Sequence, residues 1–131
     1  MIADGSAPAP ARQGALLALA VVLGVLLGWL GARPLSGLGV GNVLIWAVAV
    51  VTLGMMDGTA PGKAVRLGLF GFVLGLSFMC FGYSGDAALS TRLLPFAVIG
   101  VFCAVCAVAL GALVHVVRSA LASRGTGDGS A

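Results

Sequence analysis

The sequence predicts an all-α integral membrane protein built as a bundle of four transmembrane helices. Of its 131 residues, 60% are hydrophobic and only 8% are charged, which is too little charge to coat an ordinary water-soluble fold. The ionisable residues leave four long gaps, each about the ~20 residues that a helix needs to cross a ~30 Å hydrocarbon core. These gaps lie between Arg12 and Arg33, Arg33 and Asp57, Arg66 and Asp86, and Arg92 and His115. Because the segments are apolar on all sides, they favour helices over the alternating strands of a barrel.

Turn-forming residues set the expected helix boundaries. We expect helices over about 14–31, 38–56, 64–82 and 93–118, within a membrane domain of residues 13–118. Pro34 ends the first helix, and the run Asp57-Gly58-Thr59-Ala60-Pro61-Gly62 separates the second from the third. Residues 1–12 and 119–131 are rich in small and polar side chains, which cannot offset the entropy of ordering them. They predict a disordered N-terminal tail and a flexible C-terminal tail.

The distribution of basic residues predicts the orientation. Cytoplasmic loops of membrane proteins retain Lys and Arg. If the N-terminus is inside, the inner face carries Arg12, Lys63, Arg66, Arg118 and Arg124, and the outer face carries only Arg33 and Arg92. We therefore expect both termini in the cytoplasm and a bacterial-type cytoplasmic (inner) membrane.

A weak internal repeat suggests two tandem helical hairpins. A shift of 51 residues aligns Gly24 with Gly75 and Gly31 with Gly82, and a shift of 57 aligns Gly54 with Gly111. Chance identity is high in a chain so rich in Leu, Val, Ala and Gly. The sequence leaves the duplication open.

Small residues recur at helix-packing spacing. The first helix carries Ala20, Gly24, Gly28 and Gly31, the third carries Gly71 and Gly75, and the fourth carries Gly100, Ala104, Ala107 and Gly111. In lipid, close approach of backbones through such faces holds helices together. We expect these faces to pack within one bundle, with self-association as the alternative.

Three cysteines raise the question of a metal or redox site. Cys103 and Cys106 lie three residues apart and so share one side of the fourth helix. Cys80 lies near the outer end of the third helix, at a different depth, and no other ligand-type side chain is placed to complete a metal site. We expect the thiols to pack as small apolar groups, with no metal and no cofactor.

Few polar side chains remain as functional candidates. They are Asp57 and His115 near the cytoplasmic ends of the helices, and Asn42, Thr52 and Ser77 within the apolar spans. We expect His115 at the membrane interface and Asp57 in a turn with a solvated ion pair. The chain contains no glutamate and no Asp, Lys or Arg inside the spans, so it offers no titratable group for proton-coupled export.

These observations favour a non-enzymatic role. The sequence contains no nucleophile–base constellation, no paired carboxylates and no phosphate-binding loop, and its scattered basic residues form no nucleic-acid patch. The preferred interpretation is an accessory or scaffold protein in the lipid bilayer that packs against itself or a larger membrane-protein partner. The alternative is a homo-oligomeric channel or transporter for a small or apolar solute, lined by Asn42, Thr52 and Ser77.

Overall fold

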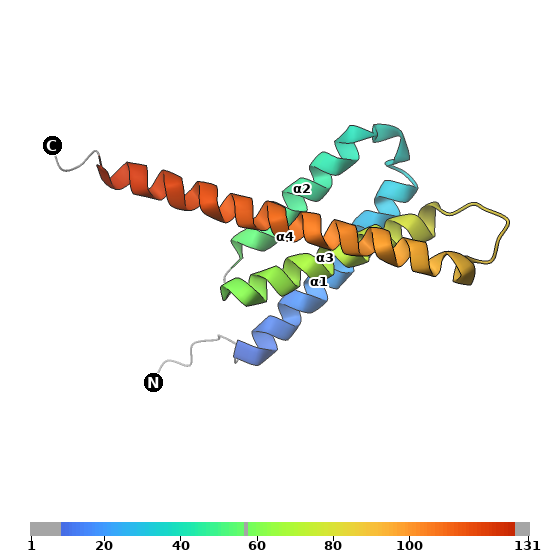
Figure 1. The fold of residues 1–131 in the computed structure, drawn as a ribbon, viewed down its shortest axis with the longest axis horizontal. Helices are drawn as coiled ribbons and strands as arrows, with labels where there is room; N and C mark the ends of the chain where they lie inside the picture. Colours follow the sequence, from blue (N-terminus) through green and yellow to red (C-terminus); the bar gives the residue numbers. More distant parts are fainter. Residues whose placement is uncertain (1–8, 57, 128–131) are drawn as a thin grey trace.

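The computed structural model describes residues 9–56 and 58–127, and this part of the chain is all-α, as predicted. Four α-helices follow one another: α1 (Ala9–Ala32), α2 (Val40–Met55), α3 (Ala60–Gly82) and α4 (Leu89–Gly127), with a short 3-10 helix, η1 (Ser36–Leu38), before α2. Figure 1 shows α3 between α1 and α4, while α2 diverges from them toward its N-terminal end.

Three of the described helices, α1, α3 and α4, are long and apolar enough to cross a membrane. The fourth, α2, has only 16 residues. At 1.5 Å per residue it is roughly 24 Å long, less than the ~30 Å hydrocarbon core. The expected second helix over 38–56 is thus divided into η1 and α2. The division falls at Gly39, whose φ of 52° is a conformation that residues with a Cβ rarely adopt.

α1, α3 and α4 each extend beyond an expected boundary. α3 begins at Ala60 instead of 64, because Thr59 caps it by accepting a hydrogen bond from the Gly62 N–H at 3.3 Å, and Pro61 is tolerated in a first turn. α1 begins at Ala9, within the tail expected to be disordered, and residues 1–8 lie outside the described part. α4 continues from Arg118 to Gly127, so most of the expected flexible C-terminal tail is helical.

Close contact between α1 and α3 depends on glycine. Gly24 and Gly28 of α1 are buried. A Cβ added to Gly28 would lie 2.7 Å from the Cβ of Ser77, and one added to Gly24 would lie 3.2 Å from the backbone nitrogen of Leu74. Side chains at these positions would push the two helices apart.

The other side of α3 contacts α4 in the same way. A Cβ on Gly71 would lie 2.6 Å from the carbonyl oxygen of Cys103 and 2.9 Å from the Cα of Ala104, and one on Gly75 would lie 3.2 Å from the Cα of Gly100. Further along α4, Ala107 is buried and Gly111 faces the Leu67 side chain. The small-residue face of α1 therefore packs on Leu74 and Ser77 of α3, and the small-residue faces of α3 and α4 pack on each other.

A small apolar core lies where the four helices meet. Phe70 and Leu53 are its largest fully buried side chains, and it also contains Ala20, Val50, Leu67, Leu74 and Ala107. Arg66 is buried beside this core, only 3% exposed, and its Nη1 donates a hydrogen bond to the Leu53 carbonyl at 3.2 Å. This bond satisfies a carbonyl in the last turn of α2, which the helix itself leaves unpaired.

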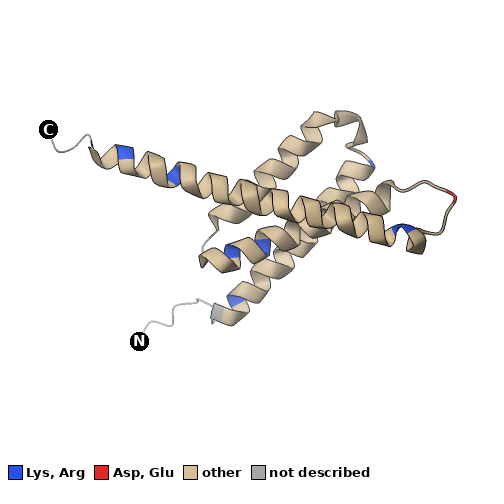
Figure 2. Cartoon of the chain, in the orientation of Figure 1, with Lys and Arg blue, Asp and Glu red and all other residues tan. Residues whose placement is uncertain are grey.

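The two hairpins pack differently. α3 and α4 lie against each other along their small-residue faces, whereas α1 packs on α3 and separates from α2 beyond their shared turn (Figure 1). Their basic residues also divide between the two ends of the molecule (Figure 2). Lys63 and Arg66 lie near the start of α3, and Arg118 and Arg124 lie near the end of α4. Arg33 follows α1, Asp86 lies in the loop after α3, and Arg92 lies in the first turn of α4.

Candidate functional site

The structure places the polar candidates in separate surroundings. Thr52 is exposed, and its hydroxyl donates to the Val48 carbonyl of its own helix at 2.8 Å. Ser77 lies in the contact between α1 and α3. His115 lies at the basic end of the molecule, and Asp57 is outside the described residues. Asn42, Thr52 and Ser77 therefore do not line one common path.

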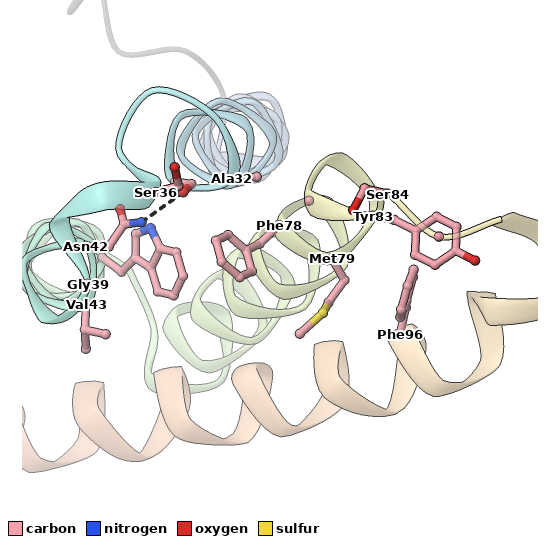
Figure 3. Close-up of a pocket in the computed structure, with 14 residues that line it drawn as sticks. Ala32, Ser36, Gly39, Asn42, Val43, Phe78, Met79, Tyr83, Ser84 and Phe96 are labelled. Carbon is pink, nitrogen blue, oxygen red and sulfur yellow. Dashed lines mark hydrogen bonds between the residues drawn. The ribbon is translucent and has the colours of Figure 1, made fainter. Parts of the chain in front are cut away.

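Asn42 lines a large cavity at the end of the molecule opposite the termini (Figure 3). The volume of this Asn42 cavity is about 760 Å³. Its walls come from the end of α1, the following turn, the first half of α2, the end of α3 with the loop after it, and the start of α4. The lining residues are Gly31, Ala32, Ser36, Gly39, Asn42, Val43, Trp46, Phe78, Met79, Gly82, Tyr83, Ser84, Gly85 and Phe96.

Two polar atoms beside this cavity lack hydrogen-bond partners among the described residues. Asn42 is only 6% exposed; its Nδ2 donates to the Gly31 carbonyl at 3.2 Å, but its Oδ1 accepts no hydrogen bond. The buried Nε1 of Trp46 also has no acceptor. Because Asn42 and Trp46 are four residues apart on α2, an unpaired acceptor and an unpaired donor lie on neighbouring turns. Leaving such a group unpaired costs about 1–3 kcal/mol, so native proteins rarely do it without a reason.

Gly31 allows this arrangement. A Cβ at position 31 would lie 2.9 Å from Asn42 Nδ2 and 3.1 Å from the Trp46 ring. The end of α1 can therefore approach α2 only at a residue without a side chain. On the small-residue face of α1, Gly24 and Gly28 allow close contact with α3, and Gly31 allows close contact with the amide of Asn42.

Aromatic rings form the apolar wall of the cavity. Trp46 and Phe78 meet edge to face with their centroids 5.2 Å apart, and Tyr83 and Phe96 do so at 5.7 Å. The Tyr83 hydroxyl donates to the Ala87 carbonyl at 2.9 Å, which anchors the loop after α3. No described lining residue is charged.

The described cysteines are distributed over different surroundings. Cys103 is half-buried against Gly75, Cys106 is exposed, and Cys80 is half-buried near the end of α3. All three are free thiols. Within residues 9–56 and 58–127, no group of three or more His, Cys, Asp or Glu residues is arranged to hold a metal ion.

Sequence reasoning identified Asn42 but did not connect it with Trp46 and Gly31, and it did not identify Arg66 as a buried residue. The available signal for Trp46 was its i, i+4 spacing from Asn42, and for Arg66 its place inside α3, at the start of a stretch without charge that runs to Asp86. Comparison with known proteins adds no further assignment, since the chain matches no protein-family model, no curated protein and no solved structure.

Proposed function

We propose that this chain is a non-enzymatic membrane protein that binds a small, uncharged and largely apolar solute in the Asn42 cavity. The observation that carries the proposal is the unpaired Oδ1 of the buried Asn42 beside a cavity of about 760 Å³. Sites for small molecules typically measure about 300–1,000 Å³ and combine apolar and aromatic walls with a few placed polar groups. The Asn42 cavity fits this description.

The two unpaired atoms indicate the chemistry of the solute. A hydroxyl group can donate to Asn42 Oδ1 and accept from Trp46 Nε1. Both atoms are covered by their neighbours, so a hydroxyl would reach them after a small rotation of either side chain. The apolar body of the solute would lie against Phe78, Met79 and Phe96. An alcohol with a hydrocarbon tail meets these requirements, and the uncharged walls disfavour an ion.

In this proposal α2 completes a fourth crossing together with η1, and the basic residues near the termini face the cytoplasm of a bacterial-type cell. The Asn42 cavity then lies in the outer half of the bilayer. A solute dissolved in the outer leaflet could reach the cavity without crossing water.

A scaffold role is the second candidate, and the exposure of α2 supports it. Val40, Leu44 and Val48 recur every four residues along one side of α2 and are 78%, 65% and 66% exposed. The small-residue face of α1 is already covered by α3, and those of α3 and α4 cover each other, so a second copy or a larger membrane partner would use this α2 face.

Tryptophan fluorescence tests solute binding, because Trp46 lines the cavity and Trp29 is exposed on α1. A brominated long-chain alcohol, which quenches nearby indole, is titrated into the protein in detergent. The Trp29→Phe variant, which retains Trp46, should show saturable quenching. The Trp46→Phe variant should show only the gradual quenching expected for a lipid-exposed indole.

Identical, non-saturating curves from the two variants would rule out binding in the Asn42 cavity. The scaffold alternative is then tested by replacing Leu44 and Val48 with Trp, which enlarges the α2 face. If that face forms an interface, the substitutions should abolish an assembly visible by sedimentation; if the protein is a monomer that binds a solute, they should change nothing.

A further inference from the structure

A second cavity lies at the basic end of the molecule. It measures about 300 Å³ and is formed by the end of α2, the start of α3 and the second half of α4. Lys63, His115 and Arg118 all line it, and none of its described lining residues is acidic. We call it the basic cavity. Its volume is roughly ten times the ~30 Å³ that one water molecule occupies in the liquid.

The fold gathers these three side chains from distant parts of the sequence. Lys63 lies in the first turn of α3, and His115 and Arg118 are three residues apart on α4, so they share one side of that helix. Gly54 and Gly111 also line the cavity and leave room between the helices. The N-terminus of α3 adds the positive end of its helix dipole at Ala60, another lining residue.

We propose that the basic cavity binds a negatively charged phosphate group. The Lys63 ammonium supplies three N–H donors, the Arg118 guanidinium supplies a planar pair and the His115 ring supplies another, which together match the oxygens of a tetrahedral oxyanion. Asp57 precedes the lining residue Gly58 and is outside the described residues; one carboxylate cannot neutralise both Lys63 and Arg118.

The position of the cavity suggests two sources for the phosphate. Arg66 and His115 bound the charge-free stretches of α3 and α4, and the cavity lies at this end of both helices. In a bilayer spanned by α3 and α4, the cavity would lie at the depth of the lipid headgroups, where the headgroup of an anionic phospholipid can reach it. A free phosphate from the adjoining water presents the same chemistry. This inference does not depend on the Asn42 cavity, because the two sites share no lining residue.

Lys63 is the only lysine in the chain, which makes it a specific chemical reporter. An amine-acylating reagent applied to the protein in a phosphate-free maltoside detergent modifies only Lys63 and the N-terminal α-amine, and mass spectrometry separates the two products. We expect short-chain phosphatidylglycerol, inorganic phosphate, or both, to slow acylation of Lys63 relative to the α-amine. Sodium chloride of equal ionic strength should leave the ratio unchanged.

A matched pair of variants tests whether the protection comes from this cavity. Arg118→Gln removes a cation from the cavity, while Arg92→Gln makes the same charge change at the opposite end of α4. The concentration of anion that half-protects Lys63 should rise about tenfold or more in Arg118→Gln, because a charge-assisted hydrogen bond is lost. It should not change in Arg92→Gln.

The possible outcomes distinguish the two sources of the phosphate group and include results that would overturn the proposal. Protection by phosphatidylglycerol alone identifies a lipid headgroup, and protection by phosphate identifies a site open to free anions. Absence of protection in both arms of the wild-type experiment would overturn the proposal without any variant. Equal weakening in Arg118→Gln and Arg92→Gln would also overturn it, because that result indicates only general attraction between a basic protein and anions.

Discussion

Asn42 shows which properties of a single residue can be predicted from the sequence and which require the structure. The sequence shows an amide side chain inside an apolar span. Burying an amide in lipid costs free energy unless it is hydrogen-bonded, so Asn42 is a candidate functional residue. Its unpaired Oδ1 is not visible there, because that depends on how α2 turns away from α1 after Gly39. The same holds for Arg66, which the sequence assigns to the cytoplasmic side and which the fold buries against Leu53.

Replacing Asn42 with Leu separates function from stability. Asn42→Leu removes one hydrogen bond, to the Gly31 carbonyl, but also removes the unpaired Oδ1, so the two effects on the free energy of unfolding nearly cancel. We expect the melting temperature in detergent to change little and saturable quenching of Trp46 by the brominated alcohol to disappear. A large loss of stability with binding intact would make Asn42 a structural anchor instead.

Replacing Arg66 should lower the stability of the protein, in contrast to Asn42→Leu. Arg66→Met keeps most of the side-chain volume but leaves the Leu53 carbonyl without its donor, which typically costs about 1–3 kcal/mol. We expect a lower melting temperature and faster hydrogen exchange in the last turn of α2. Arg33→Met, at an exposed position, serves as the control and should leave both measurements unchanged. Unchanged exchange in Arg66→Met would contradict the proposed anchoring of α2.

At the scale of helices, spacing alone showed which residues would form packing faces. The small residues of α1 fall on one side because they recur every three or four positions. Spacing did not show which helix each face would meet: neighbours in sequence usually pack together, yet α1 lies on α3. The C-terminal end of α4 was not predicted either: residues 119–127 are all exposed, and the good helix formers Ala, Leu and Arg among them favour continuation of the helix.

Glycine-to-alanine pairs test these helix contacts. Gly71→Ala places a Cβ 2.6 Å from the Cys103 carbonyl oxygen and 2.9 Å from the Ala104 Cα, and these backbone atoms of α4 cannot move aside as a flexible side chain can. We expect a loss of about 1–3 kcal/mol in the free energy of unfolding at every protein concentration. Gly14→Ala meets nothing within 4 Å and should stabilise α1 by up to about 1 kcal/mol.

Gly111→Ala provides an internal comparison, since its added Cβ meets the end of the flexible Leu67 side chain instead of backbone. We expect a loss smaller than that of Gly71→Ala. Chemical denaturation of all three variants in the same detergent gives the comparison. Equal tolerance of alanine at Gly14, Gly71 and Gly111 would show that α3 and α4 are not in close contact.

At the scale of the whole molecule, composition and the apolar spans were sufficient to predict an all-α chain, and three of its described helices are long and apolar enough to cross a membrane. The two cavities were not predictable, because each joins side chains from three or more segments that are distant in sequence. That Asn42 and Phe96 line one cavity, and Lys63 and Arg118 another, follows only once the order of helices around α3 is known.

The orientation of the molecule can be measured by cysteine labelling from outside the cell. In a variant with Cys80, Cys103 and Cys106 replaced by Ala, single cysteines are introduced at Ser36 or Ala88, at one end, and at Thr59 or Ser123, at the other. We expect a membrane-impermeant maleimide to label the first two positions only. Labelling of Thr59 from outside would reverse the assignment and place the Asn42 cavity in the inner leaflet.

Binding of a hydroxyl group at Asn42 and Trp46 is tested most directly by the indole N–H resonance of Trp46. This resonance is observed by NMR in the Trp29→Phe variant with a matched pair of ligands. Octanol and octane share a hydrocarbon chain, but only octanol carries a hydroxyl. We expect octanol to move the Trp46 resonance downfield in a saturable way, because the Trp46 Nε1 gains a hydrogen-bond acceptor. We expect no such shift with octane. Equal shifts with the two ligands, or no saturable shift with octanol, would contradict a hydroxyl-binding site at Asn42 and Trp46.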